Sequence, residues 1–352
     1  MQQTTTPDPS LELIGLVQRL SLARSLAEIQ SIVRSGARRL TGADGATFVL
    51  RDGDKCFYAD EDAIEPLWKG QRFPLGQCIS GWAMNNRRSV AIEDIYVDDR
   101  IPHAAYRPTF VKSLAMVPIR TLEPVGAIGN YWAHQRQPSD HELDLLQALA
   151  DSTAVAIENV QVYDQLDAAR TETLQCLARA AEYRDGATHE HTERVAGLAA
   201  QLATELGWTA ERVELLRLAA PLHDIGKLAV ADAVLLKAGK LTDEEFDQVK
   251  EHAEAGASIL SGTHSDVLQM GREIARTHHE WWDGSGYPHG LRGADIPDAG
   301  RIVALADVYD ALTSPRPYKD AWTHEQARDE IVRLRGRHFD PAVVDAFLRL
   351  RP

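Results

Sequence analysis

The segment from residue 139 to residue 183 is the feature that most constrains the fold. It contains no glycine or proline, and its apolar residues recur at helical spacing. At 1.5 Å per residue, about 45 residues would form a helix of roughly 65 Å, whereas a small domain is only about 30 Å across. We therefore expect one long helix that connects two domains instead of lying within a single core.

The length and composition agree with two folded domains. The chain has 352 residues, of which 44% are hydrophobic and 26% charged, and domains commonly contain about 100 to 200 residues. No segment approaches the roughly 18 consecutive apolar residues of a membrane helix, and the N-terminus has no signal pattern. We expect a cytoplasmic protein without a membrane-spanning part, whose residues 1–9 are disordered.

Charge and cysteine content exclude some functions. A net charge of −14 argues against binding to a nucleic-acid duplex, because such affinity comes from clustered lysine and arginine. An anionic substrate would then need local positive charge or a metal. Cys56, Cys78 and Cys176 are few, odd in number and far apart in sequence, which fits neither a disulfide framework nor a zinc ribbon. A reducing compartment is compatible with this pattern.

The first half alternates between helical and strand patterns. Residues 10–40 have apolar positions at helical spacing, and short β-branched or aromatic segments follow at 46–53, 55–60, 88–94, 113–121 and 126–133. This order, with PLGQCISGWAMNNRRSVAIEDIYVDDR at 74–100, resembles a GAF domain over about residues 10–160. The resemblance implies an α+β domain with an antiparallel sheet and flanking helices, which acts as a small-molecule sensor or dimerisation module. Cys78 as a chromophore anchor and His103 as a haem ligand remain alternatives to ordinary packed or exposed residues.

The connecting helix has an approximate spacing of three and four between apolar residues. This spacing predicts a parallel two-stranded coiled coil and hence a homodimer through the helix and the GAF-like domain. A helix docked on its own domain is the alternative, because charged residues interrupt the seam. The apolar positions are Leu146, Leu149, Ala156, Val160, Tyr163, Leu174 and Leu177.

The second half is predicted to be a helical bundle that carries a metal site. Ten of the thirteen histidines lie between residues 189 and 338. Neighbouring side chains on a helix point about 100° apart, so the adjacent pairs His223-Asp224 and His278-His279 suit two cations better than one. A carboxylate such as Asp224 can bridge two cations, and such a pair is the usual arrangement for attack at phosphorus. The candidate ligands are His191, His223, Asp224, His252, His278, His279 and Asp307.

Each candidate ligand also has a purely structural explanation when it is considered alone. His223 and Asp224 could be a buried hydrogen-bonded pair, and His252 could be a surface residue. The metal hypothesis therefore depends on the whole set.

Four longer motifs contain these residues: EYRDGATHEHTERV (182–195), LHDIGK (222–227), HHEWWDGSGYP (278–288) and ADVYDALTSPRPYK (306–319). Together they resemble the HD-GYP domain of the HD superfamily of metal-dependent phosphohydrolases, over about residues 172–352. The resemblance implies an all-α bundle that hydrolyses cyclic dinucleotides, most often cyclic di-GMP, to linear pGpG or GMP. It also implies that the seven candidates are the metal ligands.

The resemblance extends to residues around the metals. Lys227, Arg316 and Lys319 would hold phosphate or guanine, Lys227 would also stabilise charge during catalysis, and Asp185 would act as a proton shuttle. An ion pair for Lys227 and a solvated loop for the other two cations are the alternatives. The loop of Gly286, Tyr287 and Pro288 would lie beside the ligands and would be a contact for a GGDEF-type partner.

Family members with three metals carry a glutamate where this chain has Ala187. We therefore predict two divalent ions, and the missing ligand argues against full hydrolysis to GMP. Imidazole and carboxylate ligands without thiolate suit iron, manganese, cobalt or zinc better than magnesium, and we favour iron or manganese.

The predicted function is a GAF-regulated cyclic di-GMP phosphodiesterase. A catalytically weak receptor for cyclic dinucleotides and a hydrolase of another cyclic or linear dinucleotide are the alternatives.

Overall fold

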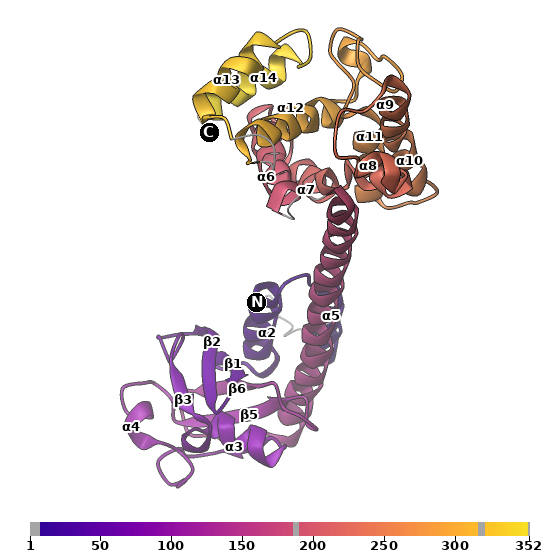
Figure 1. Ribbon diagram of the computed structural model, residues 1–352. Coiled ribbons are helices and arrows are strands. Elements are labelled where there is room, and N and C mark those ends of the chain that lie inside the picture. Colours follow the sequence, from indigo (N-terminus) through magenta and orange to yellow (C-terminus); the bar gives the residue numbers. More distant parts are fainter. Residues whose placement is uncertain (1–7, 186–189, 316–320, 351–352) are drawn as a thin grey trace. The chain divides into compact units, whose positions relative to one another are not determined.

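The computed structural model describes residues 8–185, 190–315 and 321–350. The chain divides between Leu166 and Asp167 into two compact units (Figure 1). Every helix in the described ranges is too short or too polar to span a bilayer. Residues 1–7 of the predicted disordered N-terminus lie outside the described residues, and the first helix already begins at Pro9.

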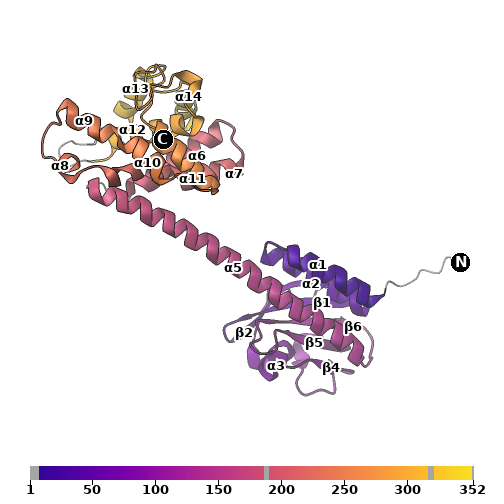
Figure 2. The ribbon, with the colours of Figure 1, turned by 90° about the vertical axis from the view of Figure 1, so that its right-hand side faces the viewer.

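The N-terminal unit is built on a six-stranded antiparallel sheet with the strand order β3-β2-β1-β6-β5-β4. Two helices precede the sheet, and short helices lie between its strands (Figure 2). The elements are α1 (Pro9–Leu22), α2 (Leu26–Thr41), β1 (Gly45–Asp52), β2 (Lys55–Ala63), β3 (Arg72–Pro74), η1 (Leu75–Gln77), α3 (Ile79–Asn86), β4 (Val90–Ile92), α4 (His103–Tyr106), β5 (Ser113–Ile119) and β6 (Gly126–Trp132).

The sheet is buried on both faces. Phe48 of β1 packs with Ile29 and Val33 of α2 in one core cluster. The next residue, Val49, belongs to a second cluster that contains Ile79 and Met84 of α3. Successive residues of a strand point to opposite faces, so helices cover both sides of the sheet.

The predicted α+β fold with flanking helices is confirmed. All five predicted strand segments contain a strand, and the sequence analysis missed only β3 among the strands of the described residues. β3 has three residues, which is too few for an alternating pattern to be recognised.

The connecting helix is α5, which runs from Asp140 to Asp185 over 46 residues. Its first part docks on its own sheet, because Leu146, Leu149 and Val160 are buried in the same core cluster as α2. The predicted coiled-coil seam is therefore wrong for this part of the helix, and the docked alternative holds. Tyr163 and Leu177 are exposed.

The C-terminal unit is a helical bundle, as predicted. Its main core joins α6, α7, α12 and α14 through residues such as Leu202, Leu216, Ile302 and Phe347. The elements are α6 (Glu190–Glu205), α7 (Ala210–Ala219), η2 (Ala220–Leu222), η3 (Ile225–Ala229), α8 (Asp232–Leu235), α9 (Asp243–Lys250), α10 (His252–Ile259), α11 (Asp266–Thr277), η4 (Gly293–Asp295), α12 (Asp298–Thr313), α13 (His324–Arg333) and α14 (Pro341–Leu350).

Two helical segments of the bundle are interrupted. The segment 210–226 leaves the α-helix at Ala219 and continues as η2 and η3, because Pro221 cannot donate a backbone hydrogen bond. The segment 242–261 divides into α9 and α10, so that His252 starts a new helix. Both breaks fall beside predicted metal ligands.

Candidate metal centre

The seven predicted ligands come from five places in the bundle. His191 lies in the first turn of α6, His252 begins α10, and Asp307 lies in α12. The pair His223 and Asp224 forms the turn between η2 and η3, and the pair His278 and His279 follows the last residue of α11. Segments that are far apart in sequence therefore converge on one site.

The ligand atoms form two groups, each compact enough to surround one cation. Within a group the ligand atoms all lie within 4.8 Å of one another. One group is His191, His223 and Asp307, and the other is Asp224, His252, His278 and His279.

Asp224 faces both groups with different oxygens. Its Oδ1 lies 3.4 Å from His252 Nε2 and 3.7 Å from His278 Nε2, whereas its Oδ2 lies 3.3 Å from His223 Nε2. On the other side, Asp307 Oδ1 lies 3.9 Å from His223 Nε2. A carboxylate in this position can bridge two cations, as the sequence predicted for Asp224.

The backbone fixes the orientation of three histidine rings. Nδ1 of His223 lies 2.9 Å from the Ala220 carbonyl oxygen, and Nδ1 of His252 lies 2.6 Å from that of Val249. Nδ1 of His278 contacts carbonyl oxygens at the end of α11 in the same way. A carbonyl oxygen can only accept, so Nδ1 carries the proton and the Nε2 lone pair remains for a metal.

The side-chain atoms that these bonds leave without a partner are suited to bind a cation. Nε2 of His223, His252 and His278 and Oδ1 of Asp224 are buried and have no hydrogen-bond partner. Buried polar atoms without a partner are rare because each costs about 1–3 kcal/mol. The residues present therefore fit a metal centre with nitrogen and oxygen donors.

The electrostatics of the site also favour metal binding. Burial and the neighbouring His278 lower the pKa of His252 to about 4, so this ring is neutral at neutral pH. Burial alone would lower the pKa of His223, but Asp224 and Asp307 outweigh it and raise the pKa to about 9. A cation would therefore displace a proton from His223 and take over its role as counter-charge.

One detail of the sequence prediction is wrong. His278 and His279 were expected to serve two different cations, but both belong to the group around His252. The expectation assumed a helix, whereas α11 ends at Thr277 and the pair lies in a turn. The two ring centroids are only 3.9 Å apart there.

The predicted motif loop lies against the ligands. The Tyr287 ring stacks on His279 with 4.7 Å between centroids. Gly286 allows the loop backbone to lie close to the turn that carries His279, since a Cβ at residue 286 would be 2.3 Å from the Trp281 amide nitrogen. The buried carboxylate of Glu280 closes the loop by accepting backbone N–H bonds from residues 289 and 291.

Lys227 lies at the centre, as predicted, and it is also paired. Its Nζ is 2.8 Å from Asp224 Oδ2. The ion pair considered as an alternative from the sequence is therefore present.

Sequence reasoning missed two carboxylates beside His191. Asp310 Oδ2 accepts from His191 Nδ1 at 2.7 Å and so turns Nε2 toward Asp307. Glu182, near the end of α5, is buried with an unpartnered Oε1, and burial raises its pKa although His191 opposes this. Asp310 is three residues after a ligand on the same helical face, and that spacing could have identified it.

Several predicted residues cannot be placed in the site. Ala187, Arg316 and Lys319 lie outside the described residues, as does the side chain of Asp185. His103 Nε2 is buried without a partner, and its ring lies 6.0 Å from that of Tyr96.

Comparison with known proteins follows the division into two units. Residues 23–158 match the GAF domain model, and residues 175–343 match the HD domain model. The chain contains a GAF domain followed by an HD domain. The predicted order of these two domains is thereby confirmed.

Three curated relatives each match between 51% and 62% of this chain. The Xanthomonas campestris pv. campestris "Cyclic di-GMP phosphodiesterase response regulator RpfG" is 50% identical over 188 residues, covering 53% of this chain and 50% of the relative. A Thermotoga maritima "Cyclic di-GMP phosphodiesterase" is 51% identical over 179 residues, covering 51% and 49%. The Vibrio cholerae "3'3'-cGAMP-specific phosphodiesterase 2" is 40% identical over 218 residues, covering 62% and 42%. The chain thus spans about half the length of these relatives.

Proposed function

We propose that this protein is a metal-dependent phosphodiesterase that hydrolyses cyclic di-GMP to linear pGpG. The observation that carries the proposal is Asp224, whose two oxygens face two separate sets of ligands. The printed names of the relatives, cyclic di-GMP and 3'3'-cGAMP phosphodiesterases, support the substrate class.

We infer that the centre holds two divalent ions, of which iron and manganese suit the donors best. His191, His223 and Asp307 would hold one ion, and Asp224 would share the other with the three remaining histidines. Five imidazoles and two carboxylates without thiolate favour these metals over magnesium. Bound there, the ions would supply Lewis-acid chemistry for phosphodiester hydrolysis.

The protein side chains then bind and orient the substrate. Lys227 contributes positive charge beside the centre, where it offsets the charge of the phosphodiester. Asp310 keeps His191 turned toward the metal position. Tyr287, stacked on His279, forms an aromatic wall on which a base can stack. We also propose phosphate or guanine binding by Arg316 and Lys319 and proton transfer by Asp185.

Product identification tests this function. The protein, purified without oxygen and loaded with Mn²⁺ or Fe²⁺, would be incubated separately with cyclic di-GMP, 3'3'-cGAMP and pGpG. We expect pGpG from cyclic di-GMP, detected by liquid chromatography and mass spectrometry. If 3'3'-cGAMP were cleaved preferentially, it would replace cyclic di-GMP as the proposed substrate. Inactivity on all three compounds with metals bound would favour a receptor function.

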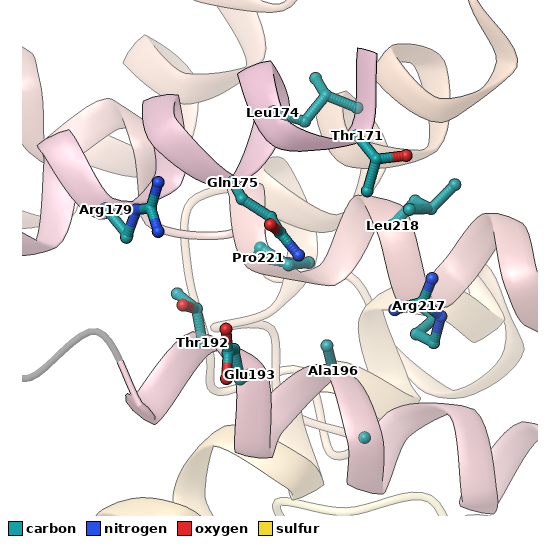
Figure 3. A pocket seen from close by; sticks show the side chains of 11 residues that line it. Thr171, Leu174, Gln175, Arg179, Thr192, Glu193, Ala196, Arg217, Leu218 and Pro221 are labelled. Atoms are coloured by element: carbon teal, nitrogen blue, oxygen red, sulfur yellow. The ribbon is translucent and has the colours of Figure 1, made fainter. Parts of the chain in front are cut away.

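We further propose that the GAF domain regulates hydrolysis through α5. Within the C-terminal unit, a pocket of about 320 Å³ separates Gln175 and Arg179 of α5 from Glu193 and Ala196 of α6 (Figure 3). A movement of α5 would be transmitted across this pocket to the start of α6, which carries His191. If a fragment from residue 139 onward matched the whole chain in activity with and without small-molecule ligands, this coupling would be wrong.

Homodimerisation through the connecting helix and the GAF domain is also proposed. Val155, Val162 and Leu166 leave 58%, 56% and 64% of their surface exposed on α5, and a contiguous exposed apolar patch marks an interaction surface. Val162→Glu should shift the mass measured by light scattering toward the monomer. The loop residue Leu122, which is even more exposed at 76%, should leave the mass unchanged when it is replaced by Glu. The loop around Tyr287 is the proposed contact for a GGDEF-type partner.

A further inference from the structure

Two cysteines that are distant in sequence meet inside the N-terminal unit. Cys56 lies on β2 and Cys78 directly precedes α3, and only 0% and 6% of their surfaces are exposed. Both side chains lie in the same buried cluster, and the strand register sets Cys56 opposite Phe73, the residue before Pro74, whose carbonyl oxygen lies 3.6 Å from the Cys78 sulfur. The third cysteine, Cys176, is exposed on α5. The fold thus creates a thiol pair that cysteine spacing alone did not suggest.

The surroundings of Cys78 stabilise its thiolate. The Ser80 hydroxyl donates to its sulfur at 3.3 Å. Hydrogen bonding from the Cys56 thiol has the largest effect on the pKa of Cys78. Together with the hydrogen bonds from Ser80 and the Gly81 N–H, it outweighs burial and lowers this pKa to about 7. The same hydrogen bond, followed by burial, raises the pKa of Cys56, which stays protonated. When protonated, Cys78 donates to the Pro74 carbonyl at 3.6 Å.

The two sulfurs differ in access. Cys78 lines a pocket of about 630 Å³ whose walls include Trp82 and Arg100. The Arg100 guanidinium packs over the Trp82 ring at 4.6 Å, which fixes one wall of the pocket. Cys56 is fully buried. A small molecule that enters the pocket can therefore reach Cys78 first.

We propose that Cys78 and Cys56 are a peroxide-reactive thiol pair in which Cys78 is attacked first and Cys56 resolves it. The Cys78 thiolate would attack a hydroperoxide, forming an S–O bond and breaking the O–O bond. The alkoxide or hydroxide leaves with a proton from solvent, and the sulfur becomes a sulfenic acid. The Cys56 thiol then attacks this sulfur, an S–S bond forms, and water leaves with the Cys56 proton.

The test uses the whole chain treated with hydrogen peroxide after complete reduction. We expect a cross-linked Cys56–Cys78 peptide in the mass spectrum, and free thiols should fall from three to one. In Cys56→Ser the reaction should stop at a Cys78 sulfenic acid that dimedone traps. Cys78→Ser should consume peroxide at least about tenfold more slowly, because the low-pKa thiolate is the nucleophile.

Cys176→Ser is the matched control, since it removes a thiol outside the pair. It should form the Cys56–Cys78 disulfide as the unchanged protein does. The proposal is overturned if peroxide oxidises only Cys176 while the peptides of Cys56 and Cys78 stay reduced. This result can be read on the unchanged chain, so it does not depend on how the variants fold.

Discussion

Replacing Gly226 with alanine tests whether the close approach of two backbone segments holds the metal centre together. Gly226 lies in η3, and a Cβ there would be 1.8 Å from the His252 carbonyl oxygen and 2.5 Å from the Gly256 nitrogen. Real Cβ atoms stay at least 3.0 Å from such atoms, so η3 and α10 would have to separate by about 1 Å. Because both obstacles are backbone atoms, no side-chain rotation can relieve the clash. Overpacking of this kind costs about 1–3 kcal/mol.

Two quantities should change in Gly226→Ala. Calorimetry should show Tm lower by about 2–12 °C, since 1 kcal/mol corresponds to about 2–4 °C in a unit of this size. The separation would also move His252 away from Asp224. In the unchanged protein His252 Nε2 lies 3.4 Å from Asp224 Oδ1. Metal content per chain and the rate of cyclic di-GMP hydrolysis should each fall by about 10-fold or more, because altered support of ligands has effects of that size.

Gly197→Ala provides the control in the same unit. Gly197 lies within α6, and a Cβ there would meet no atom within 4 Å. Alanine in a helix is better than glycine by about 0.5–1 kcal/mol, so stability should stay equal or rise. If both variants retained the same Tm and the same metal content, the argument from backbone contact would be refuted.

Three further predictions concern the centre and the thiols. Asp310→Asn should lower metal retention and hydrolysis by about 10- to 100-fold, because an amide no longer fixes the proton on His191 Nδ1; unchanged metal affinity by titration would contradict this role. Chelation should lower Tm and Mn²⁺ should restore it, since a ligand at 100 times its Kd adds about 2.7 kcal/mol; equal melting curves would contradict metal binding by the folded state. In Cys176→Ser, iodoacetamide labelling of Cys78 should rise with pH through about 7 as the thiolate forms, while Cys56 stays unlabelled; peptide mapping that gave a pH-independent rate would argue against a stabilised thiolate.

Local pattern was sufficient for most of the fold. The strands around Phe48 and Tyr131 alternate or are continuously apolar, and turn residues bound them, so periodicity located them. β3 was missed because its pairing with β2 comes from the sheet and not from its own three residues. The broken helices near Pro221 and His252 depend on packing around the site, which periodicity does not report.

The convergence of the seven ligands could be predicted from the sequence, because the motifs that contain them are long enough to be recognised together. Their division into two groups was only partly predictable. The pairing of His278 with His279 depends on α11 ending at Thr277, and helix ends are the least certain part of any prediction from sequence. Glu182 and the pair of Cys56 and Cys78 depend on tertiary contacts between distant segments, which the spacing of residues does not encode.

Metal stoichiometry is the most direct test of the central claim, which is that Asp224 joins two sets of ligands around two cations. The chain purified without oxygen would be analysed by inductively coupled plasma mass spectrometry beside an Asp224→Ala variant. We predict two transition-metal ions per chain in the unchanged protein. The Asp224→Ala variant should contain fewer metal ions per chain than the unchanged protein. A metal-free protein even after reconstitution, or a variant that holds as much metal as the unchanged chain, would contradict the account.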